Sequence, residues 1–171
     1  AHLIVTSVQG AFKDYEQLAQ KVDNVQGVSG VMPFIYSEVM LSTTQGVKGS
    51  ALRGIDPQKA EQVLNLAEDL TRGSLQDLQK KADPPGVIIG QELASRLGLS
   101  LGQRVNLLSP SGKKSAAGFS PEIVVFEVVG IFDTGMYEYD SSLAYISLGA
   151  AQNLLGFKGD LVSGLEVRLE K

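Results

Sequence analysis

The sequence predicts an α+β fold, on two observations. Short runs rich in β-branched residues are interspersed with segments in which apolar residues recur at helical spacing. Nineteen glycines and six prolines indicate many turns between short elements. The 171 residues, 43% hydrophobic and 20% charged, are enough for one globular domain or for two small subdomains that share a chain.

The chain is expected to open with a strand and an amphipathic helix. Residues 3–8 are predicted as the strand. Asp14 is expected to cap a helix that ends near Val22, with Gln17 three residues after the cap. The apolar face of this helix consists of Tyr15, Leu18, Ala19 and Val22.

Three strands and a second helix follow. Residues 31–36 and 38–44 are predicted as separate strands, and Gln45-Gly46 as a hairpin turn into a strand over residues 47–55. Asp56-Pro57 marks a helix start, because a capping carboxylate precedes a proline at the first helical position. The apolar positions that continue this helix are Ala60, Val63, Leu64 and Ala67.

The middle of the chain begins with a polar stretch, residues 70–83, which we interpret as a connection between subdomains. Residues 86–90 then form a short apolar strand, and residues 91–97 carry helical spacing. Gly98 is a typical helix stop. A strand and a helix are therefore expected in close succession here.

A hairpin with an unusually long loop is predicted next. Residues 103–108 and 123–132 are expected to pair as strands, and the second is rich in β-branched and aromatic residues. The thirteen residues 109–121 lie between them, whereas a hairpin loop normally has about two to five. We expect this loop to be a protruding arm.

The arm has two interpretations. Its serines, glycines, alanines and lysines are typical of a mobile linker. Against this, Pro110 and Pro121 restrict the backbone at each end, Phe119 supplies an aromatic group, and Lys113 and Lys114 supply positive charge for an acidic protein surface. The candidate partner-binding residues are Pro110, Ser111, Gly112, Lys113, Lys114, Ser115, Ala116, Ala117, Gly118, Phe119, Ser120 and Pro121.

The last quarter of the chain is predicted as loop, strand, helix and strand. Residues 133–140 form an irregular loop that is both acidic and aromatic. A strand over residues 142–146 and a short helix over residues 148–155 follow. Residues 165–171 alternate as a final strand without a stop signal.

No catalytic or metal-binding constellation is found in the sequence. The absence of cysteine excludes thiol catalysis and thiolate metal sites, and His2 is a terminal residue. No phosphate loop and no activated serine are present. Asp133, Glu138 and Asp140 lack the alternation of a calcium loop and are interpreted as a solvated acidic loop. We predict that the chain is not an enzyme and binds no cofactor or metal.

A net charge of −4 and an isoelectric point near 5.0 predict that the chain does not bind nucleic acid. No apolar run reaches the roughly 18 to 20 residues that cross a bilayer, so the chain as given is expected to be soluble. It starts and stops within strand-like segments, and both ends are interpreted as cut from something longer.

Four segments in order resemble a known family. They are Gly-Ile-Asp-Pro at residues 54–57, Leu-Thr-Arg-Gly-Ser-Leu at 70–75, the strand, helix and strand at 86–105, and Phe-Glu-Val-Val-Gly-Ile-Phe at 126–132. Together they resemble the periplasmic domain of lipoprotein-releasing ABC transporter permeases, the LolC/LolE group. The third segment alone is similar to the wider class of MacB-like periplasmic core domains.

The resemblance implies an organisation in two subdomains. Residues 1–56 and 136–171 correspond to a porter-like subdomain built on βαβ units, incomplete at its carboxyl end. Residues 57–135 correspond to an inserted, smaller α/β subdomain that bears the long hairpin. The family's domain is inserted between the first two transmembrane helices of a permease. It therefore lies on the periplasmic side of the inner membrane.

The resemblance also implies partners. In the family, one permease uses the hairpin as a hook for the soluble periplasmic lipoprotein carrier, and the matching positions here are residues 110–121. The carrier receives a lipoprotein cargo, and the intact transporter contains a second permease subunit and a separate cytoplasmic ATPase. The carrier-binding member has basic residues beside the hook, where this sequence has Asn106 and residues 122–124.

Three alternatives therefore stay open at this point. The chain could belong to the carrier-recruiting permease, to the partner permease that handles the lipoprotein, or to a single type that does both. A different assignment is the periplasmic domain of another MacB-like permease, an exporter or a division-type system, which would contact an adaptor or a regulator of cell-wall enzymes.

Overall fold

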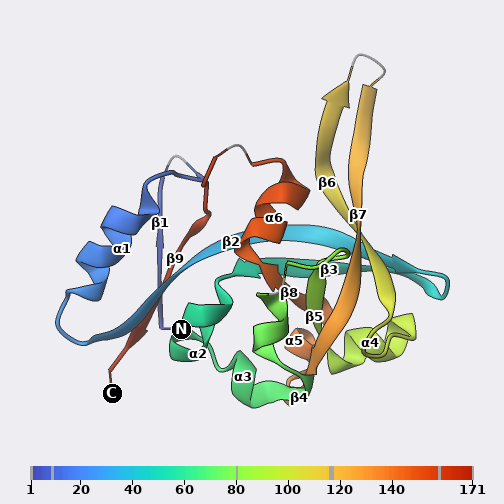
Figure 1. The fold of residues 1–171 in the computed structure, drawn as a ribbon, viewed down its shortest axis with the longest axis horizontal. Helices are drawn as coiled ribbons and strands as arrows, with labels where there is room; N and C mark the ends of the chain where they lie inside the picture. Colours follow the sequence, from blue (N-terminus) through green and yellow to red (C-terminus); the bar gives the residue numbers. More distant parts are fainter. Residues whose placement is uncertain (1, 9, 80, 116–117, 158, 171) are drawn as a thin grey trace.

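A twisted sheet with helices packed against it forms the body, and one hairpin projects from it (Figure 1). The computed structural model describes residues 2–8, 10–79, 81–115, 118–157 and 159–170, and the side chains of all of these except 110–115 and 118–121. The predicted α+β class is confirmed, since helices and strands are both present.

The elements follow one another in short succession. The first half of the chain contains β1 (Leu3–Thr6), α1 (Tyr15–Asp23), β2 (Val28–Thr43), β3 (Gly46–Ile55), α2 (Pro57–Val63), α3 (Leu66–Asp69), β4 (Leu70–Gly73) and the 3₁₀ helix η1 (Leu75–Leu78). The second half contains β5 (Gly86–Gly90), α4 (Gln91–Leu97), β6 (Arg104–Ser115), β7 (Gly118–Phe132), α5 (Tyr137–Ser142), β8 (Leu143–Ser147), α6 (Leu148–Leu155) and β9 (Gly164–Leu169).

The described strands form one sheet in the order β1-β9-β2-β3-β8-β5-β7-β4, and β6 pairs with both β7 and β2. Most neighbours are antiparallel, whereas β3 with β8 and β5 with β7 are parallel. Because β6 returns to β2, the pairings β2–β3–β8–β5–β7–β6–β2 make a closed circuit. This circuit fixes the point at which β6 and β7 leave the body.

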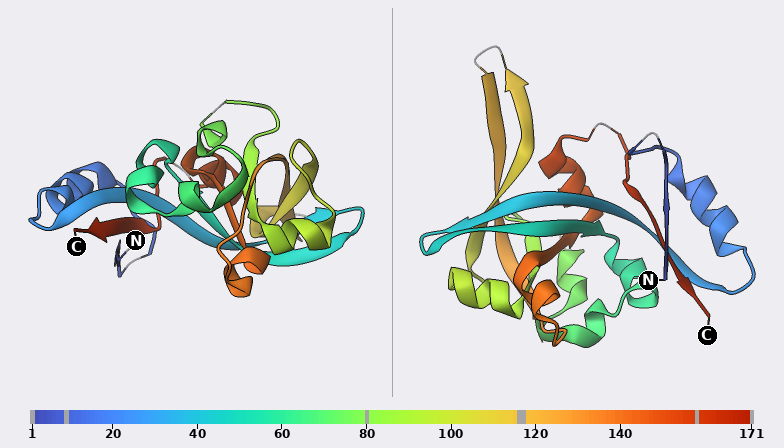
Figure 2. Two further views of the ribbon diagram at one scale, coloured as in Figure 1. Left: turned by 90° about the horizontal axis from the view of Figure 1, so that it is seen from below. Right: turned by 180° about the vertical axis from the view of Figure 1, so that it is seen from behind.

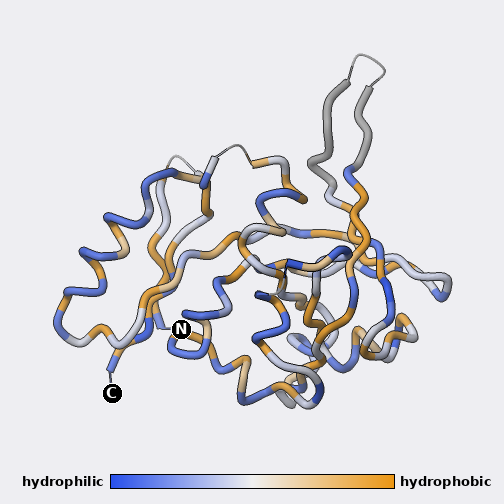
Figure 3. Tube along the Cα trace, in the orientation of Figure 1, coloured by the Kyte–Doolittle hydropathy of each residue, from blue (hydrophilic) through white to orange (hydrophobic). Residues whose placement is uncertain are grey.

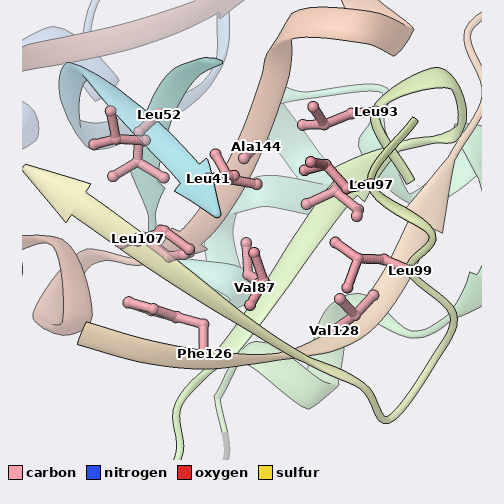
Figure 4. Close-up of a cluster of buried hydrophobic side chains, with 14 of the residues drawn as sticks. Leu41, Leu52, Val87, Leu93, Leu97, Leu99, Leu107, Phe126, Val128 and Ala144 are labelled. Atoms are coloured by element: carbon pink, nitrogen blue, oxygen red, sulfur yellow. The ribbon is translucent and has the colours of Figure 1, made fainter. Parts of the chain in front are cut away.

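Two apolar clusters lie on opposite faces of the sheet. In β5, Val87 and Ile89 belong to one cluster and Ile88 to the other, because successive strand residues point to opposite faces. The first cluster packs against α4 and α6, and Figure 4 shows part of it. The second packs against α2, α3 and η1. Figure 2 shows helices on both sides of the sheet, and in Figure 3 the part of β7 within the body is a largely hydrophobic run.

The region predicted as two strands, 31–36 and 38–44, is a single strand of 16 residues, β2. Ser37 and Glu38 pair with Leu52 and Ala51 of β3, so the ladder continues through the polar positions. The prediction was wrong because continuous pairing with β3 overrides the weak strand preference of these residues. The turn is Thr44-Gln45, one residue before the predicted position, since Thr43 pairs with Gly46.

The two helix caps predicted from aspartates differ in outcome. The carboxylate of Asp56 accepts a hydrogen bond from the Gln58 N–H (3.0 Å), which confirms the predicted start of α2. Asp14 instead adopts a left-handed conformation (φ 59°) and makes no capping bond to α1. Its predicted capping role is wrong, because this backbone geometry turns the side chain away from the first helical N–H groups.

Two other predictions changed length or type. The helix that starts at Pro57 ends at Val63 instead of running on to Ala67, because Leu64 is already extended. Residues 70–83 are more than a connection: β4 pairs with β7, and Leu75 and Leu78 are buried. The division into residues 1–56 with 136–171 and residues 57–135 stays a prediction.

The prediction of an irregular loop over residues 133–140 is wrong in its second half, where the short helix α5 begins at Tyr137. Met136 at its N-cap position makes no side-chain capping bond, so the sequence carries no helix-start signal there.

Several other expectations are met closely. The helix over residues 148–155 is α6 with the same bounds, and the helix before Gly98 is α4. Gly98 has a positive φ of 65°, which closes α4 in the way that a glycine after a helix allows. The strands predicted over residues 142–146 and 165–171 are β8 and β9, each within about two residues.

Candidate partner-binding site

The arm is the outer part of the β6–β7 hairpin, and it projects clear of the body (Figure 1). The ladder runs from Arg104 paired with Glu127 to Ser109 paired with Glu122. After a shift in register it resumes, and Ser115 pairs with Gly118. The arm is therefore a two-stranded ladder that leaves the sheet.

This finding corrects the prediction of an irregular loop over residues 109–121. Every described residue of that segment belongs to β6 or β7. The sequence was misleading because serine, glycine and lysine have little strand preference, whereas a ladder already started by β6 and β7 can extend through them. Ala116 and Ala117 lie outside the described residues.

The candidate binding residues fall in two groups. Pro110, Ser111, Gly112, Lys113, Lys114 and Ser115 lie in β6, and Gly118, Phe119, Ser120 and Pro121 lie in β7. Within this part of the arm, Lys113 pairs with Ser120 and Lys114 with Phe119. Their side chains lie outside the description, so their binding role stays a prediction.

An apolar surface lies where the arm leaves the body, and sequence reasoning missed it. Met40 of β2 pairs with Leu108 of β6, which pairs with Ile123 of β7. Two residues further from the tip along each strand, on the same face, Ser42 pairs with Asn106, which pairs with Val125. Directly paired residues on neighbouring strands share a face of the sheet. The arm-root patch consists of Met40, Val47, Leu108, Ile123 and Val125.

Four members of the arm-root patch are well exposed: Met40 by 41%, Val47 by 53%, Ile123 by 57% and Val125 by 41%. Leu108 is half-buried. The alternation of Ile123 and Val125 with inward-facing Val124 and Phe126 is visible in the sequence. What the sequence does not show is the β2–β6 pairing that brings Met40 and Val47 beside them.

A cleft of about 710 Å³ lies on the opposite side of β7. Its apolar walls come from Val124 and Phe126 of β7 and from Leu148 at the start of α6, and its polar edge includes Asp56, Lys81 and Asp83. The Asp56 carboxylate is already engaged as the cap of α2. The groups in this cleft do not form a nucleophile and base pair.

The prediction of a solvated acidic loop holds for Asp133 and Glu138, which are exposed, and is wrong for Asp140. Asp140 is only 4% exposed, and its carboxylate accepts hydrogen bonds from the N–H and the hydroxyl of Thr134, both at 2.8 Å. Burial raises the pKa of Asp140, but these hydrogen bonds outweigh it, so the pKa lies below its ordinary value. Asp140 therefore stabilises the loop.

His2 also has a structural role in this structure. Its Nδ1 accepts a hydrogen bond from the Leu169 N–H (2.9 Å), which joins the start of β1 to the end of β9. Among the residues described, no group of three or more His, Cys, Asp or Glu side chains is placed to hold a metal ion. None of the described helices is both long and apolar enough to span a bilayer.

Other titratable groups with shifted pKa values lie away from the arm, in the sheet and in α1. Arg53 of β3 forms an ion pair with Glu166 of β9, which is 1% exposed, and its guanidinium lies 5.2 Å from the centre of the Phe34 ring. Burial lowers the pKa of Arg53. Burial, and secondarily Asp160, raises the pKa of Tyr15 to about 12. The Arg53–Glu166 ion pair therefore joins β3 to β9.

The sheet, the helices on both faces and the long hairpin define a class of extracytoplasmic transporter domains. Residues 3–171 match the MacB-like periplasmic core domain, and the chain belongs to that family. Two solved structures share the fold. The extracellular domain of the noncanonic ABC-type transporter YknZ from Gram-positive bacteria has a TM-score of 0.63 and 18% identity, with 99% of this chain and 82% of that chain covered. The periplasmic region of MacB from Actinobacillus actinomycetemcomitans has a TM-score of 0.60 and 14% identity, covering 98% and 73%.

The curated relatives include transmembrane proteins of lipoprotein-releasing systems. The "Lipoprotein-releasing system transmembrane protein LolC" of Neisseria meningitidis serogroup B (strain ATCC BAA-335 / MC58) is 29% identical over 171 residues, which is 98% of this chain and 40% of the relative. LolC of Xylella fastidiosa (strain 9a5c) is 28% identical over 99% of this chain and 40% of the relative. LolE of Haemophilus influenzae (strain ATCC 51907 / DSM 11121 / KW20 / Rd) is 20% identical over 91% and 36%.

The chain thus spans about two fifths of the length of these relatives. They confirm the predicted resemblance to LolC/LolE-type permeases, and with the family they place the chain on the periplasmic side of the inner membrane. Their names assign them to a transport system and not to a class of enzyme.

Proposed function

We propose that this chain is the non-catalytic periplasmic domain through which a lipoprotein-releasing permease contacts a periplasmic lipoprotein carrier. The β6–β7 arm is the contact element, and the observation that carries the proposal is its projection from a closed circuit of strands (Figure 1). A ladder that leaves its sheet adds little to the core of the domain. Its length is explained by a partner that lies beyond the body.

The ladder geometry supports recruitment because it limits the entropy lost on binding. Nine residue pairs join β6 to β7, including those that hold the arm beyond Ser109. A segment that already has its bound shape loses less conformational freedom when a partner docks. The arm therefore acts as a preformed hook.

The arm-root patch supports a partner that covers both the arm and its base. Exposed apolar residues on one continuous sheet face are typical of protein interaction surfaces. Asn106 and residues 122–124 stand where the resemblance implies basic residues in the carrier-binding member, so these positions carry no positive charge. We expect contact at the root to depend on apolar burial, with Lys113 and Lys114 as the source of charge attraction.

The rest of the transporter is part of the same proposal. Lipoprotein cargo, a second permease subunit and a cytoplasmic ATPase would complete the system. The names of the curated relatives, which describe transmembrane proteins of a lipoprotein-releasing system, support this assignment. The lack of a phosphate loop in the sequence agrees with ATP hydrolysis on another subunit.

The test is a titration of the domain with the cognate periplasmic lipoprotein carrier. The wild type is compared with a variant that lacks residues 111–120 and with Phe119→Ser/Lys113→Gln/Lys114→Gln. We expect each to weaken binding by about tenfold or more, as truncation of central interface residues does. Val25→Ser, an exposed apolar position outside the arm and its root, is the matched control and should bind like the wild type.

A salt series separates the contributions within the site. Ile123→Ser/Val125→Ser should weaken binding at every salt concentration, whereas the lysine substitutions should matter less as salt rises. Absence of carrier binding by the folded wild type would overturn the proposal. It would favour the partner permease that handles the lipoprotein, or another MacB-like permease whose domain contacts an adaptor or regulator.

A further inference from the structure

A second group of exposed apolar side chains lies at the start of α5. Met136 is 55% exposed, Tyr137 54% and Tyr139 49%, and these three make up what we call the α5 patch. In the described part of the chain, no other three exposed large apolar residues fall within four consecutive positions. Helix α5 lies at the end of the body opposite the side from which the arm projects (Figures 1 and 2).

The α5 patch is displayed by a loop that the core holds in place. The Met136 N–H donates to the hydroxyl of Thr134 (3.0 Å), and that hydroxyl donates to the buried carboxylate of Asp140 (2.8 Å). A Cβ atom on Gly90 would clash with the backbone of Asp140, so the end of β5 packs directly against α5. The exposure therefore belongs to a rigid segment, and docking onto it loses little chain entropy.

Carboxylates border the α5 patch. The Asp133 N–H donates to the Asp69 carbonyl (3.0 Å), which brings the start of β4 beside the loop. Burial raises the pKa of Asp69, and the neighbouring charges of Glu68, Asp140 and Asp133 raise it further. With the exposed Glu138, these residues make the surroundings of the patch acidic.

One cation is already bound at the patch by the chain itself. The Arg96 guanidinium lies 5.4 Å from the centre of the Tyr137 ring and donates a hydrogen bond to the Tyr137 hydroxyl. A guanidinium over a tyrosine face is the geometry that aromatic side chains offer to cations. Tyr139, half exposed, is left with a ring available to a second cation.

We propose that the α5 patch docks a basic, partly apolar segment of another protein. Lysine or arginine side chains of that segment would lie against the tyrosine rings and the carboxylate rim, and its apolar residues would cover Met136. Charge complementarity selects this occupant, because an acidic partner or an anionic lipid surface would be repelled by Glu68, Asp69, Asp133 and Glu138. The inference does not rest on the role proposed for the arm.

The probe is a synthetic amphipathic helix of lysine and leucine, titrated into the domain and followed by backbone amide chemical shifts. We expect the largest shifts within residues 133–140. Met136→Ser/Tyr139→Ser should weaken binding by about tenfold, a typical loss for central aromatic and apolar contacts. Glu68→Gln/Glu138→Gln should weaken it less and reduce its salt dependence. Val25→Ser/Leu101→Ser is the matched control on exposed apolar positions outside the arm-root patch and the α5 patch.

Four results would overturn the proposal. They are shifts spread evenly over the surface, equal affinity of the α5 variants and the wild type, equal binding of a peptide with glutamate in place of lysine, and loss of peptide binding when residues 111–120 are deleted. Vesicles of phosphatidylethanolamine and phosphatidylglycerol test the remaining occupant. Vesicle binding that depends on Tyr139 and is not displaced by the peptide would assign the patch to lipid and refute the proposal.

Discussion

The two long hairpins of this domain have opposite relationships to its body. The β2–β3 hairpin ends in a tip that is tied down: the Thr43 hydroxyl donates to the Leu97 carbonyl (3.0 Å), and the Gln45 side chain lies against Gly98 after α4. The β6–β7 hairpin is held by β2 only at its root, and the described residues beyond Ser109 pair only with one another. The β2–β3 hairpin therefore stabilises the fold, whereas the β6–β7 hairpin extends beyond it.

Strand length that stabilises the fold can thus be distinguished from strand length that serves binding. Residues of β2 and β3 contribute to both buried apolar clusters, and Arg53 of β3 forms an ion pair with Glu166. In Figure 1 the outer arm extends away from the body, and its described residues beyond Ser109 pair only with one another. Damage to the first hairpin should therefore appear as lost stability, and damage to the second as lost binding.

The largest effect is expected from Arg53→Met. The substitution leaves the Glu166 carboxylate buried without its partner, so the free energy of unfolding should fall by about 3–5 kcal/mol. Urea unfolding followed by circular dichroism measures the loss. The double variant Arg53→Met/Glu166→Leu should recover most of it, and equal losses in the single and double variants would show that the ion pair is not what matters.

The α5 loop offers an intermediate case, since it is exposed like the arm but tied like the β2–β3 tip. The pKa of Asp140 is depressed, so its contribution is complete above its unfolded value and lost as the pH falls below about 4. Asp140→Asn should lower the free energy of unfolding at pH 7 by about 1.5–3 kcal/mol, the range for charge-assisted hydrogen bonds.

Unfolding measured from pH 7 to pH 3 checks this contribution. The gap between wild type and Asp140→Asn should narrow toward acid, because both then carry a neutral group at position 140. Asp69, with a raised pKa, contributes with the opposite sign, so only the difference between the two proteins is informative. A gap that stays constant with pH would contradict the role assigned to the carboxylate.

A smaller effect is expected at the tied tip. Thr43→Val keeps the shape of the side chain and removes its hydrogen bonds to the Leu97 carbonyl and the Gln45 N–H. We expect a loss of about 1 kcal/mol, typical of a partly buried hydrogen bond. Thr44→Val, at the exposed neighbouring position, is the control in thermal unfolding. If both variants lost stability equally, turn propensity would be the cause and not the tie to α4.

The smallest effect on stability is expected from the arm itself. Replacement of residues 111–120 by a two-residue turn should change the free energy of unfolding by less than about 0.5 kcal/mol, as for surface changes that remove no core contact. The same variant is expected to lose carrier binding. A loss of several kcal/mol in a urea titration would mean that the arm packs against the body. It would contradict the conclusion that only the β2–β3 hairpin stabilises the fold.

Local signals in the sequence predicted much of this fold. Asp56-Pro57, Gly98 and the spacing of residues 148–155 gave accurate helix ends, because caps and stops act over a few residues. The single strand β2 was split in the prediction, because Ser37 and Glu38 look like a break until their pairing with β3 is known. Strand pairing across distant segments leaves no local trace.

The candidate site shows the same division. The arm was found from its length between two strand-like segments, while the arm-root patch needed the β2–β6 register that sets Met40 beside Leu108. The burial of Asp140 was missed since its partner Thr134 has no distinguishing pattern in sequence. Alternation along the strand places Ile123 and Val125 on the same face of β7, but only the fold shows that this face is exposed.

The closure of the strand circuit has a mechanical consequence. Three residue pairs join β6 to β2, whereas nine join β6 to β7. Force applied to the arm, as when a bound protein pulls away, would reach the β2–β6 seam before it could separate the arm's own strands. Leu41 and Leu107 form one of the pairs in that seam, and both side chains are buried in the core. Opening of the seam would therefore expose apolar surface to water, which opposes displacement of the arm at its root.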